Sequence, residues 1–185
     1  MNIRYASIED MSKIKSLYSE VAKTEGGIAR FQYEITESYI LEFIKNSVES
    51  GVILVAENES RDIIGEIHTY RSGLRVFDHV FTNLTIAVSP NHENKGKKLF
   101  FTLLEIVEKN KDILRVGKKL FFTLLEIVEK NKDILRVELI ARESNKKAID
   151  FYKKLGFEIE GALRNKIKNS NGKMESDIIM GWIKK

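Results

Sequence analysis

Short stretches of alternating apolar and polar residues and longer amphipathic stretches follow one another along the chain. The alternating stretches predict strands at residues 2–6, 52–57, 63–70, 81–88, 134–141, 157–163 and 177–182. Helical spacing of apolar residues predicts helices at residues 7–23, 36–48, 97–109 and 146–155, and Ser7 with Asp10 resembles a capping box at the start of the first. The resulting order, β-α-α-β-β-β-α-β-α-β-β, predicts one α+β domain over residues 1–185 with a mixed, mostly antiparallel sheet flanked by helices.

An exact repeat interrupts this pattern. Residues 96–116 and residues 117–137 carry the same 21 residues, GKKLFFTLLEIVEKNKDILRV. Two identical copies with nothing similar elsewhere indicate a tandem duplication, either recent or designed, because solenoids need three or more units that drift apart. The strand at 134–141 must use the second copy, since only that copy continues into Glu138. We therefore expect the first-copy helix, 97–109, to keep the core position and residues 111–133 to be surplus.

The expected surplus holds a whole amphipathic helix, residues 118–130. A helix continuous through both copies would extend beyond a domain of this size and expose its second apolar half. We therefore expect another subunit to cover the surplus helix, giving a homodimer or a swapped oligomer.

Composition narrows the function classes. The 185 residues include no cysteine and only three histidines, which argues against disulfides, thiolate catalysis and a metal site. The net charge is +4, but basic and acidic residues alternate along most of the chain, so nucleic-acid binding is not expected. No apolar run is long enough for a membrane helix and the first residues lack a signal peptide's apolar stretch, so we expect a cytoplasmic protein without a membrane partner.

The most specific motif lies near the last predicted helix. It reads Asn145-x-x-Ala148-x-x-Phe151-Tyr152-x-x-Leu155-Gly156-Phe157. This motif and the order of elements resemble the GNAT family of N-acetyltransferases, whose fold is the acyl-CoA N-acyltransferase fold. The resemblance implies that acetyl-CoA is the co-substrate, that Asn145 binds its pantetheine arm and that Tyr152 protonates the departing thiolate. The residue-level alternative is that Tyr152 is an ordinary core residue of an amphipathic helix.

A second stretch fits the family in part. The resemblance implies that amide groups of the loop before the central helix bind the CoA pyrophosphate, here with candidate residues Glu93, Asn94, Lys95, Gly96, Lys97 and Lys98. Only Gly96 matches the family pattern cleanly: either Glu93 replaces an Arg or Gln and Lys98 replaces a Gly or Ala, or about two residues have been lost from this stretch. The resemblance also implies that backbone amides of Ile86, Ala87 and Val88 contact the pantetheine and stabilise the oxyanion.

A general base is expected because a primary amine is mostly protonated at neutral pH and only its neutral form attacks. Alternation along the strand at 63–70 places Glu66, His68 and Tyr70 on one sheet face. Glu66 or His68, acting directly or through water, is the candidate base. The alternative is that both are solvated strand residues.

The sequence thus predicts an acetyltransferase that moves an acetyl group from acetyl-CoA to a small amine or a protein N-terminal amine by direct attack in a ternary complex. The rival interpretation is a non-catalytic acyl-CoA-binding or oligomeric interaction module on the same fold.

Overall fold

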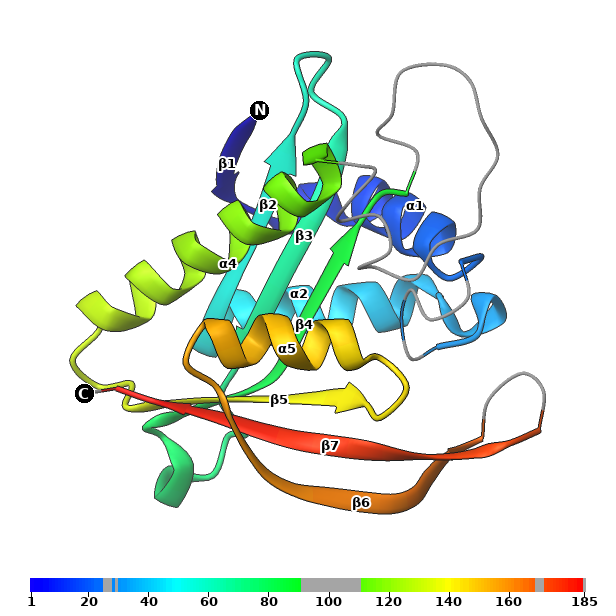
Figure 1. Ribbon diagram of the computed structural model, residues 1–185. Helices are drawn as coiled ribbons and strands as arrows, with labels where there is room; N and C mark the ends of the chain where they lie inside the picture. The colour runs from blue at the N-terminus through cyan, green and yellow to red at the C-terminus, as the bar shows by residue number, and fades with distance from the viewer. Residues whose placement is uncertain (25–27, 29, 91–110, 169–171, 185) are drawn as a thin grey trace.

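The computed structural model describes residues 1–24, 28, 30–90, 111–168 and 172–184, and these form a seven-stranded sheet with helices on both faces (Figure 1). The strand order is β1-β2-β3-β4-β5-β7-β6, with the β4–β5 pair parallel and all other neighbours antiparallel. The strands are β1 (Asn2–Tyr5), β2 (Gly51–Glu57), β3 (Ile63–Tyr70), β4 (Val80–Val88), β5 (Arg136–Arg142), β6 (Glu158–Lys168) and β7 (Met174–Ile183). This is the predicted mixed α+β architecture.

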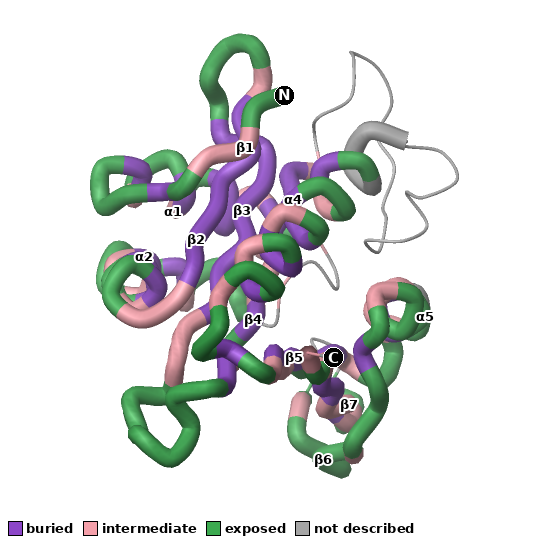
Figure 2. The backbone as a smooth tube through the Cα atoms, turned by 90° about the vertical axis from the view of Figure 1, so that its left-hand side faces the viewer, coloured by how far each residue is buried: buried purple, intermediate pink, exposed green. Residues whose placement is uncertain are grey.

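Within the described residues, two helices cover each face of the sheet. α1 (Met11–Val21) and α2 (Glu37–Ser50) lie behind the sheet in Figure 1, while α4 (Lys111–Lys130) and α5 (Lys146–Lys154) lie in front of it. Burial is concentrated in β2, β3 and β4, whereas β6 is exposed along most of its length (Figure 2). No described helix is long and apolar enough to cross a bilayer.

Local signals set the start of the first two helices. The Ser7 hydroxyl accepts from the Glu9 amide, and the Asp10 carboxylate accepts from the Ser7 amide, which completes the capping box predicted for this turn. A short 3₁₀ turn, Ile8–Asp10, follows before α1 begins at Met11. Thr36 caps α2 by accepting from the Tyr39 amide.

The central helix corrects the assignment of the two repeat copies. α4 runs through Lys111–Lys130, so it contains the second-copy helix and the last six residues of the first copy. The segment expected to be surplus, 111–133, therefore holds the core helix, and the described residues contain no surplus helix. The first-copy helix expected in the core, 97–109, lies outside the described residues.

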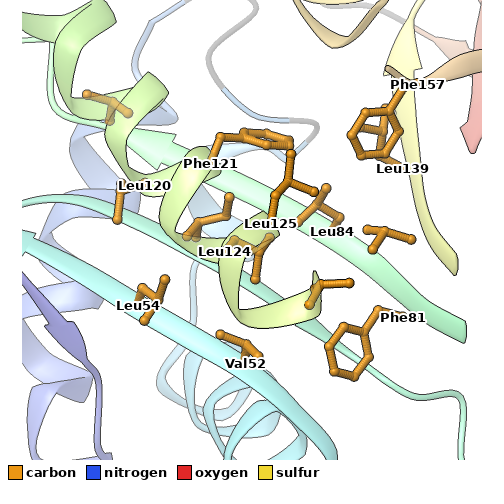
Figure 3. Packing of buried hydrophobic residues seen from close by; sticks show 14 of the residues in the cluster. Val52, Leu54, Phe81, Leu84, Leu120, Phe121, Leu124, Leu125, Leu139 and Phe157 are labelled. Atoms are coloured by element: carbon orange, nitrogen blue, oxygen red, sulfur yellow. The ribbon is translucent and has the colours of Figure 1, made fainter. Parts of the chain in front are cut away.

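The second-copy helix fills the centre of the molecule. Leu120, Phe121 and Leu124 are fully buried on the side of α4 that contacts β2, β3 and β4, and Figure 3 shows them in one cluster with Val52 and Leu54 of the sheet. Because these side chains cover their own sheet, the premise that helix 118–130 would need another subunit to cover it is wrong.

The turn after α4 explains why the second copy takes this position. Both copies carry the same apolar stripe, so packing of the helix alone cannot choose between them. The second copy, however, continues through a short turn into β5, where the Asp133 amide donates to Asn131 Oδ1 and Ile134 is fully buried. Lys184 Nζ, at the end of β7, donates to the Asn131 carbonyl and holds this turn. A core helix from the first copy would have 21 residues inserted at that turn.

Candidate active site

The β4 and β5 strands part soon after they meet. Their parallel ladder has two described pairs, Val80 with Arg136 and Phe81 with Val137, after which β5 is paired through Arg142 with β7. β4 is irregular just beyond this point, where its register with β3 shifts and Asn83 adopts a positive φ of 55°. The candidate residues Ile86, Ala87 and Val88 follow the irregularity, so the side of their strand that faces β5 forms no described ladder with it. Such an edge suits the pantetheine contacts implied by the family resemblance.

Tyr152 lies in an aromatic cluster between α4 and α5. Its ring centroid is 5.5 Å from that of Phe121 and 6.1 Å from that of Phe157. Burial of the hydroxyl raises the pKa of Tyr152 to about 12. The phenol is therefore neutral at physiological pH and keeps a proton that it can donate.

Asn145, at the start of α5, has its side chain engaged in the fold. Its Oδ1 accepts from the Ala148 amide at 3.2 Å, so Asn145 is the N-cap of the helix that carries Tyr152. The motif asparagine thus fixes where α5 begins, and no described contact tests its predicted role in binding pantetheine.

The helix that should present amide groups to a pyrophosphate is longer than the sequence suggests. Gly117, the second-copy counterpart of Gly96, lies beside the end of β4: a Cβ built on it would be 3.8 Å from Val88 Cγ2. It also lies six residues inside α4, where amide N–H groups donate to carbonyls of the preceding turn. The helix amides nearest the β4 end are therefore used within the helix and do not fit a phosphate. The candidates Glu93, Asn94, Lys95, Gly96, Lys97 and Lys98 lie outside the described residues.

The two candidate bases are buried together behind the sheet. Glu66 is 0% exposed and His68 is 3% exposed, which excludes their interpretation as solvated strand residues. Glu66 Oε1 lies 3.0 Å from His68 Nδ1, and the His68 ring stacks on that of Phe43 with centroids 4.2 Å apart. His68 also stacks on Tyr70, as expected for residues that share a sheet face.

Tyr18 is a member of this cluster that the sequence did not reveal. Its hydroxyl donates to Glu66 Oε2 at 2.6 Å, from a position in the buried stripe of α1. Burial, followed by the neighbouring Glu66 carboxylate, raises the pKa of Tyr18 well above its ordinary value. The only sequence signal was a tyrosine within an otherwise apolar stripe, because a buried phenol requires a hydrogen-bond partner.

Comparison with known proteins gives a family match over part of the chain. Residues 113–157 match the model of the acetyltransferase (GNAT) family, a range that covers the second copy, β5 and the Asn145–Phe157 motif. No curated protein matches the chain.

Solved structures share the fold over nearly the whole chain. The acetyltransferase of GNAT family from Streptococcus pneumoniae superposes with a TM-score of 0.76 at 19% identity, covering 98% of each chain. Ribosomal-protein-alanine N-acetyltransferase from Brucella melitensis gives 0.74 at 18% identity, covering 99% of each chain. The phosphinothricin acetyltransferase from Sinorhizobium meliloti, solved in complex with AcCoA, gives 0.73 at 19% identity, covering 98% of this chain and 87% of that one. The chain thus has the fold of these acetyltransferases over nearly its whole length, and residues 113–157, from α4 through β5 and α5, match the GNAT family model.

Proposed function

We propose that the protein transfers the acetyl group of acetyl-CoA to a primary amine by direct attack in a ternary complex. The parting of β4 from β5 after Phe81 is the observation that carries this proposal. An extended thioester arm needs backbone donors along one side, and the β4 edge from Ile86 to Val88 offers them without a competing β5 ladder. Two similar structures were solved with acetyl-CoA.

The proposed chemistry divides between two faces of the sheet. A β4 amide near Ile86–Val88 would stabilise the oxyanion formed when the amine attacks the thioester carbonyl. The tetrahedral intermediate then collapses, breaking the carbon–sulfur bond, and Tyr152 would donate its proton to the departing thiolate. Its raised pKa keeps the phenol protonated until that step.

The base would act on the attacking amine. Glu66 and His68 belong to β3, which pairs with β4 so that His68 is opposite Thr85 and Glu66 is opposite Ala87. With this register, the proposed proton acceptors lie one strand away from the proposed oxyanion donors. Because both are buried, a bridging water would carry the proton from the amine to the pair.

Tyr152→Phe tests the assignment of the acid. We expect kcat to fall by about ten- to a thousandfold, while acetyl-CoA binding is unchanged, because the ring is kept and one proton donor is lost. Thiol release from acetyl-CoA, measured across small amines, polyamines and peptide N-termini, gives kcat and the acceptor class together. Tyr33→Phe is the matched control because Tyr33 is 79% exposed. An unchanged kcat in Tyr152→Phe would remove Tyr152 from the mechanism.

The position of Gly117 inside α4 favours a second candidate, the non-catalytic interaction module. The helix amides nearest β4 donate to carbonyls within the helix, so they are not available to a pyrophosphate. Acetyl-CoA that binds only the native state raises its apparent stability, by about 2.7 kcal/mol at one hundred times Kd. A thermal shift without turnover of any amine would support the module, whereas turnover excludes it.

A homodimer or swapped oligomer remains a prediction that now depends on residues 96–110, and light scattering of the full chain tests it.

A further inference from the structure

A buried chain of hydrogen bonds joins α1 to the candidate base. Tyr18 Oη donates to Glu66 Oε2 at 2.6 Å, and the other carboxylate oxygen, Oε1, lies 3.0 Å from His68 Nδ1. The direct separation between Tyr18 Oη and His68 Nδ1 is 3.5 Å, so the carboxylate is the main link. All three side chains are at most 3% exposed. Each Glu66 oxygen therefore has one short partner, Tyr18 of α1 for Oε2 and His68 of the same strand for Oε1.

This arrangement defines the orientation of the imidazole. With Oε2 occupied by the phenol, Oε1 is left to accept from His68 Nδ1–H, and the Nε2 lone pair is then available for a proton. The Phe43 ring stacks on the imidazole at an interplanar angle of 7°, and the Tyr70 ring stacks at 10°. The hydrogen bond and the two stacked rings leave the imidazole little freedom to turn.

The surroundings of the pair contain few charges. α1 contributes Tyr18, α2 contributes Tyr39, and β3 itself contributes Tyr70. Among the described residues, the guanidinium that acts on Tyr18 and Tyr39 is that of Arg30, which lies 3.9 Å over the Tyr39 ring. β4 places Thr85 and Ala87 opposite the pair, and β2 places Ile53 and Val55 there.

We propose that Tyr18 is a positioning residue of the acetyltransferase, holding the Glu66 carboxylate so that it orients His68 as proton acceptor. This inference rests on the proposed role of Glu66 and His68 as the base. A phenylalanine would fill the same volume, and a phenol in this position costs desolvation unless it is hydrogen-bonded. By donating to the carboxylate, Tyr18 stabilises the pair in the deprotonated form that accepts a proton.

The test is Tyr18→Phe in the full chain, read by NMR and by kinetics. Two-dimensional ¹H–¹⁵N spectra of the histidine rings follow the titration of His68, which is one of only three histidines. Losing a hydrogen bond to the carboxylate favours the protonated pair, so we expect its titration midpoint to move up by about 1 to 2 pH units. The acid limb of the pH profile of kcat, measured with acetyl-CoA and n-butylamine, should move to higher pH by the same amount. The KM for acetyl-CoA should be unchanged.

Tyr39→Phe is the matched control because it removes a phenol of the same cluster that has no described bond to Glu66. It should leave both the midpoint and the acid limb in place. Equal midpoints in Tyr18→Phe and Tyr39→Phe would overturn the positioning role of Tyr18, whatever the base is. A midpoint that moves while the acid limb does not would instead overturn the assignment of Glu66 and His68 as the base, and with it any effect of Tyr18 on catalysis.

Discussion

The six residues Lys-Asp-Ile-Leu-Arg-Val occur twice and fold in two ways. Residues 111–116 form the first turns of α4, whereas residues 132–137 form the turn after α4 and the start of β5. The last valine is buried in both places, beside Gly65 on the sheet in the first case and opposite Trp182 on β7 in the second. Identical local preferences have given a helix and a strand.

The difference shows that neighbours beyond the segment decide its conformation. In the second copy, the Leu135 amide donates to the His79 carbonyl and the Leu135 carbonyl accepts from Lys184, which ties the backbone into the sheet. In the first copy, six residues precede a strongly amphipathic helix, and continuing that helix backward brings Val116 onto β3. Propensity differences of less than 1 kcal/mol per residue are easily overridden by such contacts.

The largest change to the chain that tests this comparison is the removal of one copy. Deleting residues 96–116 joins Lys95 directly to Gly117, and a central helix that began there would have its first amides free for the CoA pyrophosphate. We expect acetyl-CoA to bind about ten- to a hundredfold more tightly than to the full chain, as measured by titration calorimetry. Equal or weaker binding would show that the backward extension of α4 does not affect CoA binding.

The next prediction compares how much the same residue in each copy contributes to the free energy of unfolding. Phe121→Ala should lower the free energy of unfolding by about 3–5 kcal/mol, because the ring is fully buried against Phe151 and Phe157. The same substitution in the first copy, Phe100→Ala, is the matched control. Urea denaturation of the two variants compares them, and equal losses would contradict the assignment of the core helix to the second copy.

A double substitution tests whether the first Lys-Asp-Ile-Leu-Arg-Val packs on β3. A Cβ on Gly65 would lie 2.7 Å from Val116 Cγ1, so Gly65→Ala should cost about 1–3 kcal/mol. Shortening the neighbour in Val116→Ala should recover part of this loss, whereas Val137→Ala should recover none. Additive losses in the Gly65 and Val116 pair would mean that the two residues are not in contact.

The smallest effect concerns the arginines of the two segments. Arg136 is paired with Glu138 and Glu160, whereas Arg115 is exposed. Arg136→Ala should cost about 0.5–1 kcal/mol at neutral pH and Arg115→Ala almost nothing.

Arg136 lowers the pKa of Glu160, so this stabilisation exists above the unfolded-state pKa and is lost as pH falls through the folded one. Thermal unfolding should therefore show the full cost of Arg136→Ala at neutral pH and a smaller cost as the pH is lowered through the acid range. A cost that persists in acid would indicate lost packing rather than a lost ion pair.

The sequence was sufficient where the signal is local. Spacing within a few residues predicts the capping box at Ser7, the buried strands β2, β3 and β4, and the Asn145–Phe157 motif. It failed for β6, which extends to Lys168 where the alternation ended near Leu163, because both faces of this part of the strand are largely exposed and leave no pattern.

Two further features could not be found locally. Identical copies offer no difference from which a core helix could be chosen, so the turn at Asn131 and the contact with Lys184 had to be seen in three dimensions. The candidate site was found in part: Glu66 and His68 share a face as expected, but the bond to Tyr18 spans 48 residues. Only the fold brings α1 to that carboxylate.

The two-pair junction between β4 and β5 has a consequence for how the molecule opens. Few backbone bonds cross it, so the β1–β4 half and the β5–β7 half are joined mainly by side chains such as Phe121, which touches α5 and Phe157 from α4. Segments joined in this way can open as separate cooperative units. In native-state hydrogen exchange, amides of β5 and β7 should therefore exchange through a lower-energy opening than those of β2 and β3. The Phe121→Ala variant should widen the gap between the two sets of exchange rates.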